Sequence, residues 1–373
     1  MRIHMLYLVQ VFRHTKQEKC KVFMPPQKPK ERKPKFTMSE IARMAGVSQS
    51  TVSRILNGNT PVAPDKQAAV LEVIKRFNYQ PNIAAQGLGS GKTLQIGVLT
   101  RYLGSPFFSE MLRGMAVAME DSSYHPVIGL GSEIPREDRS SLDRLLSRGI
   151  DGIILQAPQA SQDSNYEYIR ELAQEMPLIV IGARIPGLEK QCLSVKNFDG
   201  GYIATSHLIE KGHTSIAHIT GKLLVEDAIQ RRDGYYQALI DHGLEVIPEL
   251  VIEGDFTETS GSQAVEILLA RRDNYPFSAI FAANDQTAAG VRLALYYRGI
   301  GVPEDISLVG FDDLLSSQHM IPPLTTIRQP VYYMGLMASQ AMLALLAGEQ
   351  VHIPEIPLEL IIRQSVAFRK NST

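Results

Sequence analysis

The chain has 373 residues, of which 44% are hydrophobic and 21% charged, an ordinary composition for a soluble globular protein of about two or three domains. Its two cysteines are too few for a disulfide framework, which indicates a reduced, cytoplasmic setting. The apolar run at 5–12 is too short for a membrane span and lacks a signal-peptide cleavage site.

The net charge of −1 conceals an asymmetry between the two ends of the chain. Residues 1–92 carry 16 Lys or Arg against 5 Asp or Glu, a net of +11, whereas residues 93–373 carry 22 against 34, a net of −12. A basic head on an acidic body predicts an anionic partner for the head, and the best candidate is a polyphosphate backbone.

Residues 1–35 show no periodicity, and the Pro-broken basic run KPKERKPK predicts disorder. This run either adds non-specific attraction to phosphate or serves only as a solubilising arm. Met24 is a natural start, so we interpret residues 1–23 as an over-extended N-terminus.

Residues 37–57, TMSEIARMAGVSQSTVSRILN, have the pattern of a helix, a tight turn and a second helix. Thr37 and Glu40 have capping-box spacing, Gly46 permits the left-handed backbone that ends a helix, and Ser48 can cap the next helix. The second helix then exposes side chains that suit base edges in a DNA major groove: Gln49, Ser50, Thr51, Ser53 and Arg54. The spacing alone fits a small helical hairpin with a polar face equally well.

A third helix over 64–77 is expected to complete a domain spanning 36–81. The stretch 82–93 is short and rich in small residues, which indicates a linker that is marginal as a helix alone. It contains GSGKT, but Gln86 stands where a phosphate-binding loop needs glycine, and the segment precedes a strand rather than joining strand to helix. We therefore predict no nucleotide site there.

From residue 94 onward, apolar strand-like runs alternate with helical patterns. The strand-like runs lie at 95–100, 126–131, 152–156, 178–182, 215–220, 278–283 and 306–311. The helical patterns lie near 107–121, 137–148, 165–176, 200–211, 228–242, 259–272, 285–298 and 331–347. Continuous apolar strands predict parallel sheets covered by helices on both faces. The length favours two α/β lobes with a cleft, one at about 94–195 and 325–350, the other at about 196–322 and 351–370.

Polar and aromatic residues follow several of these strands, at the sheet edge where ligands bind in α/β folds. They are Phe107, Phe108, Gln156, Arg184, Arg231, Phe256, Asn284 and Asp312. Taken singly, each has a commoner explanation as a helix cap, a core residue or a surface charge. Together they predict a site for a polyhydroxylated ligand, because charged and amide groups pair with hydroxyls and aromatic rings cover a sugar face.

Other chemistry is not indicated. His207, His213 and His218 do not fall on one face of any element, so no metal site is predicted. The chain has no G-x-S-x-G, no Cys-x-x-Cys and no nucleophile–base pair, so neither catalytic residues nor a cofactor are expected.

From about Phe36 to its end the chain resembles the LacI/GalR family of bacterial transcriptional regulators. The most specific block is IARMAGVSQSTVSRILNG followed by NYQPN, and HLIEKGHTSIAHITG, FAANDQTAAGV, VPEDISLVGFDD and PPLTTIRQP follow in the same order as in the family. The resemblance implies a small helix-turn-helix domain joined to a two-lobed core like that of periplasmic sugar-binding proteins. It also implies base reading by Gln49, Ser50 and Arg54, and phosphate contacts by Ser48, Thr51, Ser53 and Asn57.

The resemblance further identifies residues from Asn82 to Ser90 as a hinge that becomes helical on operator DNA, with Leu88 as a minor-groove wedge. Gly87 and Gly89 lower the intrinsic helicity of this stretch by about 1 kcal/mol each relative to Ala.

In the core, the resemblance assigns Phe107 and Phe108, with Gln156 and Arg184 beside them, to the first-lobe side of the effector cleft. It assigns to the other side and the crossover Arg231, Phe256, Asn284, Asp312 and Gln329. Gly182 stands where several sugar-responsive members have an acidic residue, so Arg184 is expected to contact the ligand instead.

We therefore predict a DNA-binding transcriptional repressor that binds a palindromic operator under the control of a small sugar-like effector. A homodimer rather than a tetramer is expected because the chain has no leucine heptads. One alternative is a purine-responsive co-repressor in which Phe107 and Phe108 hold a base. A stand-alone sugar receptor or a sugar-modifying enzyme is disfavoured, because the former has no need of residues 37–57 and the latter lacks catalytic residues.

Overall fold

The computed structural model describes residues 36–57, 62–77, 79, 92–100, 103–131, 135–156 and 163–369, without side chains at 57, 135–138 and 163–165. The basic extension, Asn82 and Leu88 lie outside the described residues, as does the side chain of Asn57. The chain divides into two units, 1–86 and 87–373, each of which is described here by itself.

The described residues of the first unit form three helices, α2 (Met38–Met44), α3 (Gln49–Asn57) and α4 (Pro64–Phe77). The predicted capping box is confirmed, since the Glu40 N–H donates to Thr37 Oγ1 at 3.3 Å and the Thr37 N–H donates to Glu40 Oε2 at 2.7 Å. Gly46 has the expected left-handed backbone with φ +67°, and Ser48 Oγ accepts from the Thr51 N–H at 3.2 Å. These short-range features set the helix ends at the turn between α2 and α3, and the buried core of the three helices is Ile41, Ala42, Val52 and Val70.

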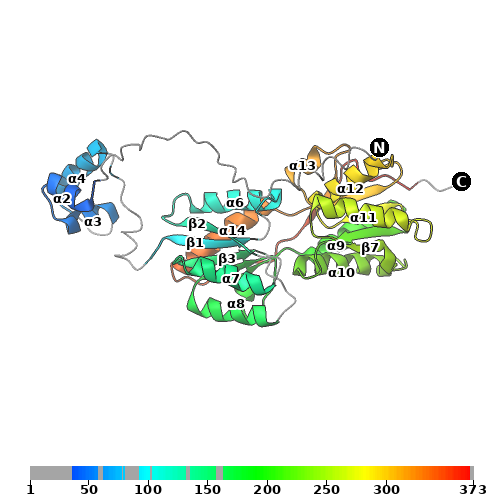
Figure 1. Ribbon diagram of the computed structural model, residues 1–373, viewed down its shortest axis with the longest axis horizontal. Coiled ribbons are helices and arrows are strands. Elements are labelled where there is room, and N and C mark those ends of the chain that lie inside the picture. The colour runs from blue at the N-terminus through cyan, green and yellow to red at the C-terminus, as the bar shows by residue number, and fades with distance from the viewer. Residues whose placement is uncertain are drawn as a thin grey trace, which may run out of the picture. The chain divides into compact units, whose positions relative to one another are not determined.

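The second unit has two α/β lobes (Figure 1). The first lobe has a parallel sheet of order β2-β1-β3-β4-β5. Its strands are β1 (Gln95–Thr100), β2 (His125–Leu130), β3 (Gly152–Gln156), β4 (Leu178–Ile181) and β5 (Cys192–Leu193). Helices α6 (Pro106–Met119) and α14 (Val331–Leu346) cover one face, and α7 (Pro135–Leu146) and α8 (Asp163–Glu175) cover the other.

The second lobe has a sheet of order β11-β10-β9-β8-β6-β7. Its strands are β6 (Ile216–Thr220), β7 (Val251–Glu253), β8 (Ala279–Ala282), β9 (Ser307–Asp312), β10 (Thr325–Arg328) and β11 (Glu359–Ile361). Helices α9 (Asn197–Glu210) and α10 (Glu226–Asp241) cover one face, and α11 (Glu258–Ala270) and α12 (Asp285–Tyr297) cover the other. The remaining helices are short: α13 (Leu315–Gln318), η1 (Glu189–Gln191) and η2 (Pro248–Leu250).

The predicted fold is confirmed in both lobes. All seven strand-like runs form strands, and their apolar side chains point alternately into cores on the two faces of each sheet. The pairings are parallel except between β10 and β11, which are antiparallel at the sheet edge. The four strands without a predicted counterpart, β5, β7, β10 and β11, have only two to four residues each.

The predicted lobe boundaries are corrected at two places. Residues 325–328 were assigned to the first lobe, but they form β10, which pairs with β9 in the second sheet. Residues 351–356 were assigned to the second lobe, but Ile353 is buried in the first-lobe core and Ile356 pairs with Val195 there. The chain therefore crosses between lobes near 196, at 329–330 and near 357, and each crossing lies just beyond a buried segment.

Candidate functional site

Helix α3 has one exposed polar face and one buried apolar face. Val52 is fully buried against the other helices, whereas Gln49, Ser50 and Arg54 are exposed. Arg54 Nε donates to the Ser50 carbonyl at 3.3 Å, so the Arg54 guanidinium lies along the helix rather than against the core. Polar donors at the front of an exposed helix are the groups that base edges in a major groove can pair with.

The core contains a cavity of about 290 Å³ at the lower end of the size range of small-molecule sites. It is lined by Leu103, Gly104, Ser105, Phe107, Gln156, Val225, Asp227, Arg231, Phe256, Thr257, Asn284, Gln286, Asp312 and Gln329. These residues come from both lobes, so the cavity lies between them. The lining residues of the first lobe lie at or after the ends of β1 and β3, and those of the second lobe include residues at or after the ends of β7, β8, β9 and β10.

Arg231, on α10, lies at the centre of the polar network of this cavity. Its side chain is buried, with Nε donating to Asn197 Oδ1 at 2.8 Å and Nη1 donating to the Ala283 carbonyl at 2.7 Å. Nη1 is also 4.0 Å from Asp312 Oδ1, and the guanidinium carbon lies 3.6 Å from the centre of the Phe311 ring. The orientation of the guanidinium is therefore set by protein contacts on two strands and a helix.

Asp312 is held at the end of β9 in a backbone conformation that is rare for aspartate, with φ +117°. Its Oδ1 accepts from Gln329 Nε2 at 2.5 Å, and the Gln329 N–H donates to its carbonyl at 3.3 Å. Burial raises the pKa of Asp312 above its ordinary value, although the charge of Arg231 opposes this shift. The strain is thus maintained by contacts from the next strand, as at many ligand sites.

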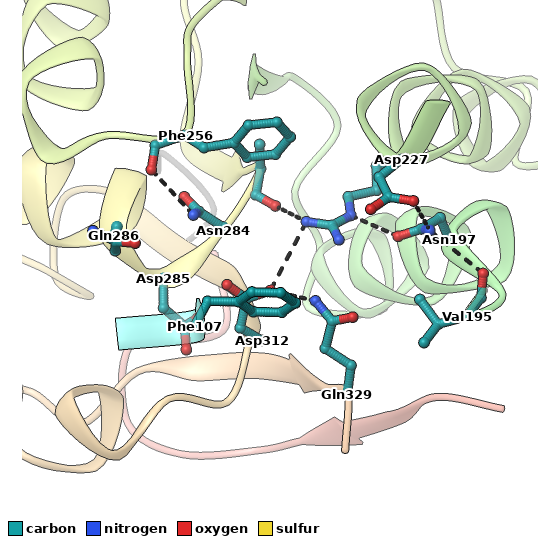
Figure 2. A network of polar contacts seen from close by, with 12 residues as sticks. Phe107, Val195, Asn197, Asp227, Phe256, Asn284, Asp285, Gln286, Asp312 and Gln329 are labelled. Atoms are coloured by element: carbon teal, nitrogen blue, oxygen red, sulfur yellow. Dashed lines mark hydrogen bonds and ion pairs between the residues drawn. The ribbon is translucent and has the colours of Figure 1, made fainter. Parts of the chain in front are cut away.

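A second carboxylate, Asp227, faces the same cavity from the first turn of α10 (Figure 2). Its Oδ1 accepts from Asn197 Nδ2 at 2.7 Å, so Asn197 joins Asp227 to Arg231. Burial raises the pKa of Asp227 to about 6. Asn197 follows directly after the first crossing between lobes, which connects the network to the interlobe hinge.

Two phenyl rings supply apolar walls. Phe107 belongs to the first turn of α6, and Phe256 follows β7 with φ +68°. The Phe256 ring lies so close to Gly221 that a Cβ there would come within 2.0 Å of it, so Gly221 makes room for the ring. The Phe256 carbonyl accepts from Asn284 Nδ2 at 3.1 Å, which ties this wall to the N-cap of α12.

Contacts at the first-lobe side complete the cavity. Gln156 Oε1 accepts from Thr100 Oγ1 at 2.5 Å, which fixes the amide at the end of β3. Ser105 Oγ donates to Gln286 Oε1 at 2.7 Å and so bonds the first lobe to the second across the cavity.

The structure brings together seven of the nine residues predicted for the effector cleft. Phe108 is instead 1% exposed in the first-lobe core, because it projects from α6 about 100° around the helix axis from the neighbouring Phe107. Arg184 does not line the cavity, since its exposed side chain reaches Glu355 at 3.6 Å after Gly182 turns the chain with φ +78°.

The cavity residues that the sequence interpretation did not select include Asp227, Ser105 and Gln286. Asp227 lies one helical turn before Arg231, so the i, i+4 spacing on a helix entering the site was the available signal. The pairing of Ser105 with Gln286 had no such signal, because these residues are 181 positions apart and belong to different lobes.

The three histidines considered for a metal are separately buried. His213 bonds Ser278 Oγ at 2.9 Å, and His218 bonds the Phe281 carbonyl at 2.9 Å. Within the described ranges, no group of three or more potential ligands is positioned for a metal ion. The helices of those ranges also include none with the length and hydropathy of a membrane span.

Comparison with protein families matches both units. Residues 37–82 match the family described as bacterial regulatory proteins, lacI family, and residues 205–366 match the periplasmic binding protein-like domain. The first match covers the helices with the exposed α3 face, and the second covers the second-lobe side of the cavity.

Similar proteins include the HTH-type transcriptional regulator GalR of Escherichia coli, 33% identical over 86% of this chain and 91% of that protein. Catabolite control protein A of Priestia megaterium is 33% identical over 88% and 98% of the two chains. The HTH-type transcriptional repressor PurR of Haemophilus influenzae is 32% identical over 88% and 98%.

Two solved structures extend the comparison to bound states. The lac repressor dimer bound to operator and an anti-inducer has a TM-score of 0.79 at 27% identity, over 89% of this chain and 99% of that one. The complex of the transcriptional regulator CelR with cellobiose has a TM-score of 0.65 at 30% identity, over 88% and 99%. These named relatives are transcriptional regulators rather than enzymes.

Proposed function

The chain belongs to the LacI/GalR family of transcriptional regulators, and we propose that it is a homodimeric repressor whose affinity for a palindromic operator is set by a sugar-like effector in the interlobe cavity. The observation that carries this proposal is the cavity itself. It combines two phenyl walls with a buried guanidinium and carboxyl groups, as a polyhydroxylated ligand requires, and its lining residues come from both lobes.

For the DNA contacts, we assign base reading to Gln49, Ser50 and Arg54. The phosphate contacts are assigned to Ser48, Thr51, Ser53 and Asn57. Exposure of the α3 front supports the first assignment. The hinge roles of Asn82 and Leu88 rest on the family resemblance, because both residues lie outside the described part of the chain.

For the effector contacts, we assign seven residues: Phe107, Gln156, Arg231, Phe256, Asn284, Asp312 and Gln329. Their convergence on one cavity supports this assignment. Phe108 and Arg184 are better explained by packing and by an exposed ion pair.

The proposal is tested by selecting operator sequences from random DNA with the purified full chain. Arg54→Ala should reduce discrimination between the selected operator and random DNA by about 1–3 kcal/mol while leaving the core folded. Arg43→Ala is a matched control, because Arg43 is exposed on α2 rather than on the reading helix. The base-reading role is refuted if the two variants discriminate equally.

A purine-type co-repressor remains the alternative because PurR proteins are among the relatives. Its predicted base sandwich between Phe107 and Phe108 does not fit the buried position of Phe108, so the base would have to stack on Phe107 and Phe256. Purine bases should then tighten operator binding, whereas an inducing sugar should weaken it. Footprinting with each ligand distinguishes the two by sign.

A further inference from the structure

The charges around the cavity do not balance. Its charged lining residues, among those the structure describes, are Asp227, Arg231 and Asp312. Asp285 lies just behind them, where it accepts from the Leu314 N–H at 2.8 Å and from Thr326 Oγ1 at 2.6 Å. The charges of three carboxyl groups therefore act on one guanidinium, and of the three only Asp227 is partly exposed.

Both lining carboxyl groups have an oxygen that the protein leaves without a hydrogen bond. Asp227 and Asp312 each use Oδ1 for a protein donor, and neither Oδ2 has a hydrogen-bond partner among the described residues. On the donor side, Arg231 already uses Nε and Nη1 for Asn197 and Ala283, which leaves Nη2 as the guanidinium nitrogen without a hydrogen bond among the described residues. A ligand that enters this space meets acceptors with negative charge on both sides of the guanidinium.

We propose that Asp227 and Asp312 make the cavity selective by charge, so that it takes a polyhydroxylated ligand that is neutral or carries an amine and rejects phosphorylated and acidic sugars. This inference rests on the proposed effector role of the cavity and specifies the class of effector. Hydroxyl and ammonium groups donate to the free carboxylate oxygens. An anionic phosphate or carboxylate placed there offers a charge instead of a donor, and in a water-poor space that charge opposes the ionised form of both carboxyl groups.

Raised pKa values agree with this geometry. Burial raises the pKa of Asp227 to about 6, and it also raises the pKa of Asp312. These carboxyl groups resist ionisation because too little positive charge lies near them. A bound cation would stabilise their ionised form, and a bound anion would destabilise it.

The test uses matched sugar series with the full chain. Each series holds the parent aldose, its 2-amino form, its uronate and its 6-phosphate, for glucose, galactose and mannose, and the measurement is the shift in Tm on adding each compound. The uronate is the critical member, because it differs from the parent mainly by replacing a hydroxymethyl group with a carboxylate of similar size. In at least one series the parent or amino sugar should raise the Tm, while the uronate and phosphate of that series should not.

Asp227→Asn and Asp312→Asn remove the charge and keep the acceptor that bonds Asn197 or Gln329. In either variant the affinity ratio between the parent sugar and its uronate should fall about tenfold or more. Asn also tolerates the positive φ at position 312. Asp233→Asn, on the same helix but paired with Arg232 away from the cavity, should leave this ratio unchanged.

Two results would overturn the inference: an acidic or phosphorylated sugar that stabilises the wild type at least as well as its neutral parent, or a panel in which no neutral or amino sugar stabilises it. Operator selection with the same preparation separates this failure from that of the proposed function. A chain that selects a palindrome but responds to sugar phosphates refutes the charge selectivity alone, whereas a chain that selects no DNA refutes the regulator.

Discussion

Arg231 is the only cation within the described lining of the cavity, and it compensates carboxyl groups that would otherwise be buried together. Arg231→Ala should therefore abolish the effector response and also destabilise the core by about 3–5 kcal/mol, because removing one partner leaves buried charge unpaired. Urea unfolding at constant pH measures the loss.

The double variant Arg231→Ala with Asp312→Asn separates charge from packing. If compensation of charge is the reason for the loss, the second substitution should restore part of the stability. A double variant no more stable than Arg231→Ala alone would mean that the contacts with Asn197, Ala283 and Phe311 account for the loss.

The environment of His218 predicts that the second lobe loses stability as the pH falls. Its ring stacks on Phe281 at 4.5 Å, its Nδ1 bonds the Phe281 carbonyl and so carries the hydrogen, and its buried Nε2 has no partner among the described residues. Protonation would bury an N–H without an acceptor, and burial accordingly lowers the pKa of His218 to about 4.

Because the folded pKa lies below the unfolded value of 6.5, the stability that the neutral ring contributes is complete above pH 6.5 and is lost as the pH falls towards 4. The loss should amount to about 3 kcal/mol. His218→Phe should flatten the urea-unfolding free energy over this pH range, whereas His125→Phe, at an exposed site, should not. Parallel pH profiles for the wild type and His218→Phe would disprove the assignment.

Some helix starts and strands can be predicted well from the sequence. Helix starts were located where short-range chemistry fixes them, as with Thr37 and Glu40, and long apolar runs gave the central strands. The short strand β10 was assigned to the wrong lobe because its pairing with β9 depends on tertiary contact rather than on any pattern within its four residues.

The same distinction applies to the candidate site. Asn284 lies two residues after the end of β8 and Asp312 is the last residue of β9, so the position of both at the sheet edge is predictable from the apolar runs that precede them. Phe107 and Phe108 follow the same strand, but only the rotation of α6 determines that one faces the cavity and the other the core.

Three helix pairs of the core meet at paired glycines. In α6 and α14, a Cβ on Gly114 would come within 2.0 Å of the Tyr332 carbonyl, and a Cβ on Gly335 within 1.9 Å of the Met111 carbonyl. The α9–α10 and α11–α12 pairs repeat this arrangement at Gly201 with Gly234 and at Gly261 with Gly290. In both lobes, helices that cover the same face of a sheet therefore pack with their backbones in contact.

Gly335→Ala should destabilise the first lobe by about 1–3 kcal/mol, despite alanine's higher helix propensity, because backbone atoms must move apart. Gln340→Ala on the exposed side of α14 is the control and should change stability little. Unfolding monitored by urea checks both, and a Gly335→Ala variant as stable as the control would show that the two helices separate without cost.

At the scale of the whole molecule, the cavity lies where the lobes are joined. Asn197 and Gln329 lie at two of the three chain crossings and bond the network around Arg231 and Asp312. The Ser105–Gln286 bond joins the two lobes through side chains alone, at residues that are remote in sequence from those crossings. A ligand that favours one lobe spacing therefore acts on the crossings and on this bond together.

Ser105→Ala removes the bond across the cavity while leaving the crossings intact. Since one neutral hydrogen bond contributes about 0.5–1.5 kcal/mol, the variant should bind the responding sugar about 2- to 12-fold more weakly and should keep its operator affinity in the absence of sugar.

Titration of labelled operator and of sugar, each with and without the other, gives four affinities. By linkage, the factor by which sugar changes operator affinity must equal the factor by which operator changes sugar affinity, in the wild type and in the variant. If Ser105→Ala weakened sugar binding only through a local contact, the coupling factor would stay at its wild-type value; a smaller factor in the variant shows that the bond stabilises one of the two lobe spacings.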